Sequence, residues 1–138
     1  MNKIPAIKYI NPSNTTVIRN TNGVAYIQSR ALADIEYVKH SFSTRLGGVS
    51  GGIWSSMNLN FGRGDEANVL ANFRLYAEAT GTDVDNMVYS MQTHTTNVIR
   101  VGRADCGNGV TKPQRFNDVD GLVTNEPGVC LVTTYADC

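Results

Sequence analysis

Polar and apolar positions alternate in two short runs near the beginning of the chain. The segment from Thr15 to Ser29 reads T-T-V-I-R-N-T-N-G-V-A-Y-I-Q-S, with Asn22-Gly23 between the two runs. Both residues of this pair tolerate a positive φ, which makes it a strong hairpin signal. A third strand is expected over Glu36 to Ser43, where polar side chains alternate with apolar ones.

A different spacing marks one helix between residues 65 and 81. Apolar and small side chains recur on a single helical face, at Val69, Phe73, Tyr76, Ala77 and Thr80. Asp65 can cap the beginning of this helix, and Gly81 can adopt the left-handed conformation that ends it. A short turn is expected after it, over Thr82 to Met87.

Shorter strands are expected in the rest of the chain, at 88–92, 97–101, 120–124 and 128–135. The last of them is apolar on both faces, which is typical of a central strand that is covered on each side. Many strands and few helices in irregular order indicate the α+β class.

A glycine-rich segment of 22 residues, Thr44 to Asp65, separates the third strand from the helix and contains six glycines. Loops of this length are uncommon inside compact domains and are usually functional. Arg45 lies at its beginning, where a guanidinium and backbone amides can bind a phosphate or a carboxylate. The alternative is a surface loop with a solvated arginine.

Composition limits the function classes. With 138 residues the chain can form one ordinary domain, and its twelve basic residues balance twelve acidic ones. This balance gives no electrostatic indication of nucleic-acid or acidic-membrane binding. No apolar run approaches the ~18 residues that span a bilayer, and the first residues lack the pattern of a secretory signal. We therefore expect a cytoplasmic protein.

The three cysteines agree with that location, because an odd number argues against a complete disulfide framework. Cys130 and Cys138 lie on one extended segment, about 26 Å apart, which is too far for a disulfide. Cys106 is expected in a turn, as an incidental thiol. No C-x-x-C pair is present, so a zinc ribbon is excluded.

The chain contains two histidines. His94 follows a predicted strand and lies among small polar residues, at the kind of strand-to-loop edge that often carries ligands and general bases. His40 falls inside a predicted strand on its apolar face, which favours a structural role.

Two further candidates lie at strand ends. Cys138 follows Asp137 at the carboxyl end of the last strand, where sheet proteins tend to form pockets. Its alternative is a small buried hydrophobe, the usual fate of a cysteine. Asp120 precedes a strand in D-V-D-G-L-V-T and is either a binding residue or a turn residue.

The order of these segments is more specific than any of them alone. Together they closely resemble the laccase-domain family, also called polyphenol-oxidase-like proteins, which includes purine nucleoside phosphorylase and peptidoglycan-editing-factor members. The resemblance extends from about His40 to Cys138. The matching segments are F-S-T-R-L-G-G-V-S, S-S-M-N-L-N, G-D-E-A-N-V, M-Q-T-H, D-G-L-V-T and the final A-D-C.

The resemblance implies an α/β/β/α sandwich of mixed sheets around one metal site. In the family this site is formed by the histidine of a Q-x-H motif, the cysteine of an A-D-C motif and the histidine of an H-x-G-W-R-G motif. The first two correspond to His94 and Cys138, and the third has no counterpart. Residues 1–138 are thus expected to be the N-terminal portion of one laccase-like domain. Without its C-terminal segment this portion should be poorly stable, metal-poor and inactive.

The family also implies an activity. It suggests phosphorolysis of adenosine, inosine, guanosine and methylthioadenosine, with adenosine deamination, so that purine nucleosides and phosphate are the expected partners. Older family annotation instead describes copper-dependent laccases. One His-Cys-His site with an open position suits zinc, whereas a multicopper oxidase needs many more histidines than the two in this segment. We therefore expect zinc, with copper as the alternative.

Roles follow for the candidate residues. His94 and Cys138 are the expected metal ligands, and Arg45 with the amides of Gly47 and Gly48 would orient phosphate. Asp120 is the remaining expected substrate-binding residue. Two other functions stay open: a Cys–His hydrolase of peptidoglycan editing, with Cys138 as nucleophile and His94 as base, and a non-catalytic binding fragment.

Overall fold

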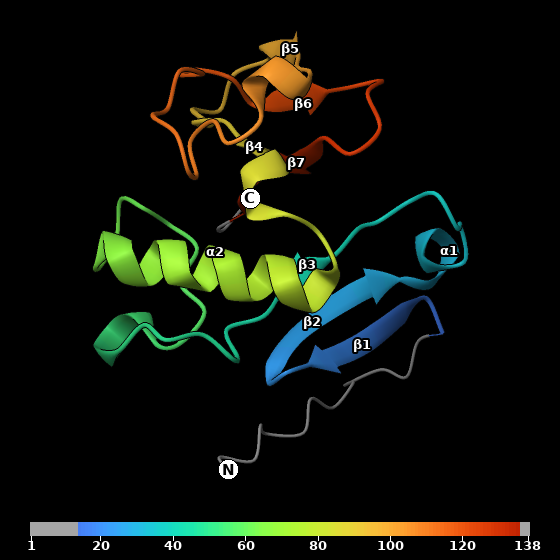
Figure 1. Ribbon diagram of the computed structural model, residues 1–138, viewed down its shortest axis with the longest axis vertical. Helices are drawn as coiled ribbons and strands as arrows, with labels where there is room; N and C mark the ends of the chain where they lie inside the picture. Colours follow the sequence, from blue (N-terminus) through green and yellow to red (C-terminus); the bar gives the residue numbers. More distant parts are fainter. Residues whose placement is uncertain (1–13, 136–138) are drawn as a thin grey trace. The chain divides into compact units, whose positions relative to one another are not determined.

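The computed structural model describes residues 14–135 and divides after Gly81 into two compact units, Met1–Gly81 and Thr82–Cys138 (Figure 1). Its sheets are antiparallel in the first unit and parallel in the second. The predicted α+β class with mixed sheets is confirmed. No helix among residues 14–135 is long and apolar enough to cross a membrane.

The first unit contains an antiparallel sheet of three strands in the order β1 (Thr16–Thr21), β2 (Val24–Ser29) and β3 (Phe42–Ser43). The predicted hairpin is confirmed, because Thr21 pairs with Val24 around the two-residue turn. Asn22 and Gly23 have φ angles of 52° and 89°, the positive values that a tight hairpin of this length requires.

The prediction of a strand over residues 36–43 is wrong for most of its length. Only Phe42–Ser43 pairs with β2, and a single helical turn, α1 (Arg30–Ala33), follows β2 directly. At His40, contacts that involve side chains take the place of the backbone hydrogen bonds of a strand. Its Nε2 accepts the N–H of Ser29 at 2.8 Å, and its carbonyl oxygen accepts the side-chain amide of Gln28 at 3.0 Å.

The predicted helix is confirmed as α2 (Glu66–Thr80). The carboxylate of Asp65 accepts the N–H groups of Ala67 and Asn68, and Gly81 ends the helix with φ of 67°. The buried face consists of Val69, Asn72, Phe73, Ala77 and Ala79. Ala79 joins Val24, Tyr26 and Met57 in the apolar core of this unit.

The second unit contains two small parallel sheets. One pairs β4 (Met87–Tyr89) with β7 (Cys130–Val132), and the other pairs β5 (Val98–Arg100) with β6 (Gly121–Val123). Each of the four strands was predicted at the right place but is shorter than expected. Two short 3-10 helices, η2 (Val84–Asn86) and η3 (Arg103–Asp105), precede β4 and follow β5.

The expectation that the last strand is covered on each side is not met within residues 14–135. In this part of the chain β7 pairs with β4 alone, and Leu131 keeps 37% of its surface exposed. The core of this unit lies beside it, around Val88, Val101 and Cys106.

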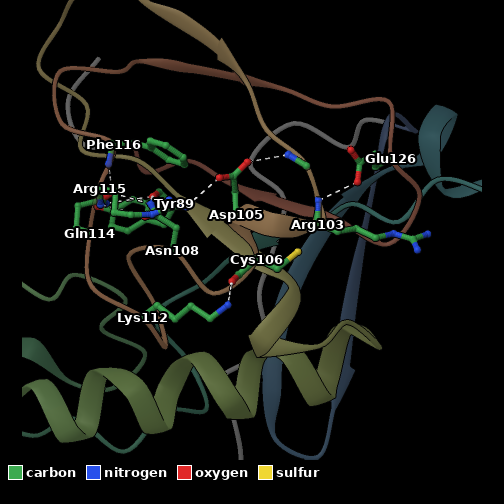
Figure 2. A network of polar contacts seen from close by, with 11 residues as sticks. Tyr89, Arg103, Asp105, Cys106, Asn108, Lys112, Gln114, Arg115, Phe116 and Glu126 are labelled. Atoms are coloured by element: carbon green, nitrogen blue, oxygen red, sulfur yellow. Dashed lines mark hydrogen bonds and ion pairs between the residues drawn. The ribbon is translucent and has the colours of Figure 1, made fainter.

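A polar network holds the loop between η3 and β6 against β4 (Figure 2). Asn108 is almost fully buried, and its side-chain amide donates to the carbonyl of Tyr89 at 2.8 Å and to Gln114 Oε1 at 2.7 Å. Lys112 donates to the carbonyl of Cys106 at 2.7 Å. Cys106 lies in a turn, as expected, and its side chain is buried in the core of this unit.

Candidate functional site

Arg45 fastens the glycine-rich loop from within. Its Nη2 donates to the carbonyl oxygens of Ile53 at 3.2 Å and Ser55 at 2.9 Å. These two residues flank the end of a short 3-10 helix, η1 (Gly52–Trp54). The carbonyl oxygen of Arg45 accepts the N–H groups of Ser56 and Met57, both at 3.1 Å. A guanidinium has five N–H groups, so this exposed side chain keeps donors for an anion.

Gly47 and Gly48 lie where the loop backbone passes very close to other backbone. A Cβ at Gly47 would lie 2.3 Å from the carbonyl oxygen of Gly23, and one at Gly48 would lie 2.2 Å from that of Ser56. The N–H of Gly48 donates to Ser56 Oγ at 3.3 Å. Close packing therefore accounts for both glycines, and their contact with phosphate stays a prediction.

Asn72 supports the glycine-rich loop, although it was not among the residues predicted from the sequence. It is fully buried on α2, and its Oδ1 accepts the N–H of Val49 at 2.7 Å. Its Nδ2 donates to Ser50 Oγ, to the carbonyl oxygen of Ser56 and to that of Asn58, at 2.8–3.2 Å. The signal was an asparagine within the apolar face of the helix, one residue before Phe73.

In the second unit, the chain leaves β4 and forms the loop that carries His94. Met91 anchors the start of this loop, since its N–H donates to the carbonyl oxygen of Phe116 and its own carbonyl oxygen accepts the N–H of Val119. His94 follows in an exposed position with φ of 65°, an uncommon backbone conformation for a residue other than glycine.

The side chain of Asp120 holds this loop by bonding to the loop backbone. Its Oδ2 accepts the N–H groups of Thr93 and Thr95, and its Oδ1 accepts that of His94, each at 3.0 Å. The hydrogen bond from Thr93, followed by those from Thr95 and His94, lowers the pKa of Asp120 from 3.8 to about 2. The carboxylate therefore stays ionised at neutral pH and binds the loop rather than lying free at a turn.

A second carboxylate supports the same loop through side chains. Asp118 accepts a short hydrogen bond from Thr93 Oγ1, and its Oδ2 accepts Nδ2 of Asn97 at 3.0 Å. The two carboxylates thus differ in what they contact, since Asp118 bonds to side chains of the loop and Asp120 bonds mainly to its backbone.

Gln92 links the His94 loop to the segment that leads to Cys138. Its Oε1 accepts the N–H of Thr134 at 2.8 Å and the hydroxyl of Thr134 at 3.2 Å. Because β4 and β7 are parallel, their carboxyl ends lie at one edge of the sheet. Both candidate ligands follow these ends. Cys138 itself, with Ala136 and Asp137, lies outside the described residues.

The described residues supply one of the two expected metal ligands. Among residues 14–135, no three histidine, cysteine, aspartate or glutamate side chains are grouped closely enough to hold a metal ion. His94 is exposed on a loop with a fixed backbone, and an imidazole nitrogen is a usual zinc ligand. The residue fits such a site as one donor, and the other donors must come from outside this range.

The sequence candidates therefore fall into two groups. Arg45, Gly47 and Gly48 belong to the loop of the first unit, and His94 and Asp120 belong to the second. His40 belongs to neither group, and its ring nitrogen bonds to the backbone at the end of β2.

Comparison with known proteins identifies the family. Residues 39–138 match the family described as multi-copper polyphenol oxidoreductase laccase. The chain belongs to this family. Membership places it in a metal-binding family, whose description names copper.

Several relatives of the laccase-family chain have names that refer to nucleosides. A purine nucleoside phosphorylase of Bacteroides thetaiotaomicron is 34% identical over 110 residues, which cover 78% of this chain and 41% of the relative. The purine nucleoside phosphorylase YlmD of Bacillus subtilis is 34% identical over 99 residues, covering 70% of this chain and 36% of the relative. The chain spans about two fifths of the length of these relatives.

Solved structures share the fold of this laccase-family chain. The crystal structure of YlmD from Geobacillus stearothermophilus matches with a TM-score of 0.71 and 26% identity, over 82% of this chain and 42% of that one. A hypothetical protein YfiH from Bacillus licheniformis also matches with a TM-score of 0.71, at 24% identity over 83% of this chain and 42% of that one. The predicted fold class is thereby confirmed.

Proposed function

We propose that this chain contributes to a zinc-dependent purine nucleoside phosphorylase that also deaminates adenosine. Relatives named purine nucleoside phosphorylase support the substrate class. The observation that carries the proposal is the pair of bonds from Thr134 to Gln92, which joins the Q-T-H segment to the segment preceding A-D-C. His94 lies in the first of these segments, and Cys138 lies four residues after Thr134 of the second.

In this proposal, His94 and Cys138 hold the metal through a neutral imidazole and a thiolate. Both donor types suit zinc, which normally has three protein ligands and one open position in catalytic sites. When bound, the metal supplies Lewis-acid stabilisation of developing negative charge. The protein's own part is to position the donors. Asp120 holds the backbone at His94, and Gln92 holds the backbone of Thr134, four residues before Cys138.

Arg45 takes the role of orienting phosphate in the proposed phosphorolysis. The phosphate oxygen attacks the ribose C1′, and the bond from C1′ to the purine nitrogen breaks. A guanidinium that is already fixed by Ile53 and Ser55 places its remaining N–H groups with little loss of entropy. For deamination, the amino group at purine C6 is replaced by oxygen from water.

The direct test is an assay of the native protein in its longest form with inosine and phosphate. Hypoxanthine and ribose 1-phosphate should form only with phosphate present, and chelation should abolish the activity until zinc is returned. Adenosine should also yield inosine. Phosphate-independent release of the base, or no reaction of any purine nucleoside, would refute the proposal.

The arginine role has its own test in the same protein. Arg45→Ala should raise the KM for phosphate at least tenfold while leaving zinc content unchanged. Arg74 is exposed on α2 and belongs to the same unit, so Arg74→Ala is the matched control. An unchanged dependence on phosphate in Arg45→Ala would remove the residue from the mechanism.

The family description supports a copper-dependent polyphenol oxidase as the second candidate. It predicts oxygen consumption with a diphenol after loading with copper, and no dependence on phosphate. A protein that oxidises diphenols and leaves inosine intact would favour this candidate over the phosphorylase.

A further inference from the structure

The three consecutive N–H groups of Thr93, His94 and Thr95 all point to one carboxylate. Successive backbone N–H groups in a turn with one left-handed residue form a concave nest that binds an anion. Here the anion is the side chain of Asp120, and the left-handed residue is His94 with φ of 65°. Thr95 adds its hydroxyl to the same Oδ2 at 3.1 Å.

We propose that Asp120 is a positioning residue for His94, and that its carboxylate sets the backbone conformation from which the imidazole reaches the metal. The proposal rests on the proposed function for the metal, but the loop geometry is independent of it. It gives Asp120 a different role from the substrate contact expected from the sequence, because both carboxylate oxygens are engaged by the loop.

An amide of the same size cannot replace the Asp120 carboxylate as the acceptor of these three N–H groups. An asparagine at position 120 offers one oxygen acceptor, and its NH₂ group would face an N–H group of the loop. At least one of the three N–H groups then loses its partner, and the uncommon φ of His94 loses its main support. The imidazole would therefore spend less time in the orientation that a metal requires.

Asp120 also links the loop to the sheet. The N–H of Asp120 and that of Gly121 both donate to the carbonyl oxygen of Asn97, at 3.0 and 3.1 Å. Asn97 precedes β5, and Gly121 begins β6. The carboxylate thus ties the His94 loop to the start of the β5–β6 sheet, so the ligand is fixed relative to a structural element rather than to a free turn.

Two control variants separate this positioning role from a general effect of negative charge on metal binding. Asp83→Asn removes the charge of another carboxylate in the same unit, which accepts the N–H of Asp85 at the start of η2. Asp118→Asn removes a charge near His94 but leaves all three backbone bonds to Asp120. A general effect of negative charge on metal binding would appear in Asp118→Asn as strongly as in Asp120→Asn.

The first readout is the zinc dissociation constant of the native protein, measured by competition with a chromophoric chelator. Asp120→Asn should weaken zinc binding about 10- to 100-fold, the range for residues that orient metal ligands. Asp83→Asn should leave the constant unchanged, and Asp118→Asn should change it much less than Asp120→Asn. Equal losses in Asp118→Asn and Asp120→Asn, or none in Asp120→Asn, would overturn the proposal.

The second readout needs neither metal nor activity. Amide hydrogen exchange by NMR should show protection of Thr93, His94 and Thr95 in the metal-free wild-type protein. Asp120→Asn should lose that protection, while the protection of β4 is retained. Unprotected amides in the wild-type protein would overturn the proposal even if the variant failed to fold. A wild-type protein that binds no zinc, with these amides protected, would instead refute the proposed function alone.

Discussion

Asn72 and Asp120 each hold a loop by bonding to its backbone, one in each unit. Asn72 is buried on α2 and reaches four groups of the glycine-rich loop, whereas Asp120 gathers three N–H groups around His94. For Asn72 the bonds are buried or partly buried, and each group left unpaired there would cost free energy. Both loops carry candidate site residues, so both supports bear on function.

The side-chain amide of Asn72 stabilises the glycine-rich loop. Asn72→Asp replaces the donating NH₂ group by an oxygen that faces Ser50 Oγ and two carbonyl oxygens. We expect a loss of about 3 kcal/mol in the free energy of unfolding, measured by urea denaturation. Asn68→Asp, one turn earlier on the same helix, is the control and should be almost neutral. Equal stability of the two variants would contradict this account of the loop.

The glycine-rich loop offers a similar pair of variants. Gly48→Ala places a methyl group 2.2 Å from the carbonyl oxygen of Ser56, so the backbone must shift. Gly51→Ala adds the same group where no atom lies within 4 Å. Thermal unfolding should show a clear loss of stability in Gly48→Ala, by about 2 kcal/mol or more, and little change in Gly51→Ala. Similar melting temperatures would show that the loop adapts freely.

At the scale of elements, the parallel pairing of β4 with β7 brings the Q-T-H segment close to the residues that precede A-D-C. The register places Tyr89 opposite Val132, and the chain then continues from both strands toward the same edge. Gln92 closes the contact beyond the last paired residues. The sequence predicted both strands, but it did not predict that they are neighbours, because pairing between strands some 40 residues apart has no local pattern.

The Gln92 contact predicts a local change that exchange measurements detect. Gln92→Leu keeps the size of the side chain and removes the acceptor of the Thr134 N–H. The amide of Thr134 should then exchange about tenfold faster, as expected for the loss of one hydrogen bond. Thr96→Ala, in the same loop, is the control and should leave this rate unchanged. An unaltered rate in Gln92→Leu would show that the segment is held by other contacts.

The thiol of Cys130 on β7 gives a prediction about pH. Burial raises the pKa of Cys130, and the neighbouring Cys106 raises it further. At a given pH the thiolate fraction is then lower than in a peptide, and the thiolate is the reactive form. Iodoacetamide at pH 8 should label Cys130 more slowly than the same peptide in urea. The difference should shrink as the pH rises, and mass spectrometry of the digested protein measures it.

Local signals account for most of what the sequence predicted correctly. Asn22-Gly23, the Asp65 cap and Gly81 each act through their own backbone conformation, so the hairpin and helix were predictable. His40 misled the prediction of a long third strand, because its ring takes the place of a ladder partner. Asp120 was expected to be a substrate-binding residue or a turn residue. Its bonds to the His94 loop had no local signal, since its partners lie about 25 residues earlier in the chain.

At the scale of the whole molecule, family membership rests on the order of several short motifs rather than on a single one. The match covers residues 39–138, and the chain spans about two fifths of the length of its relatives. The order of the motifs was visible in the sequence, whereas the links that support them were not. The bonds of Asp120 and Gln92 join the His94 loop to segments that lie about 25 and 40 residues away in the sequence.

The proposed function requires that His94 and Cys138 bind one zinc ion in the native protein. The most direct measurement is native mass spectrometry of the longest form, for the wild type and for His94→Ala, Cys138→Ser and the control Thr96→Ala. We predict one zinc per chain in the wild type and in Thr96→Ala, and loss of that zinc in the other two variants. Full zinc occupancy in either His94→Ala or Cys138→Ser would contradict the account.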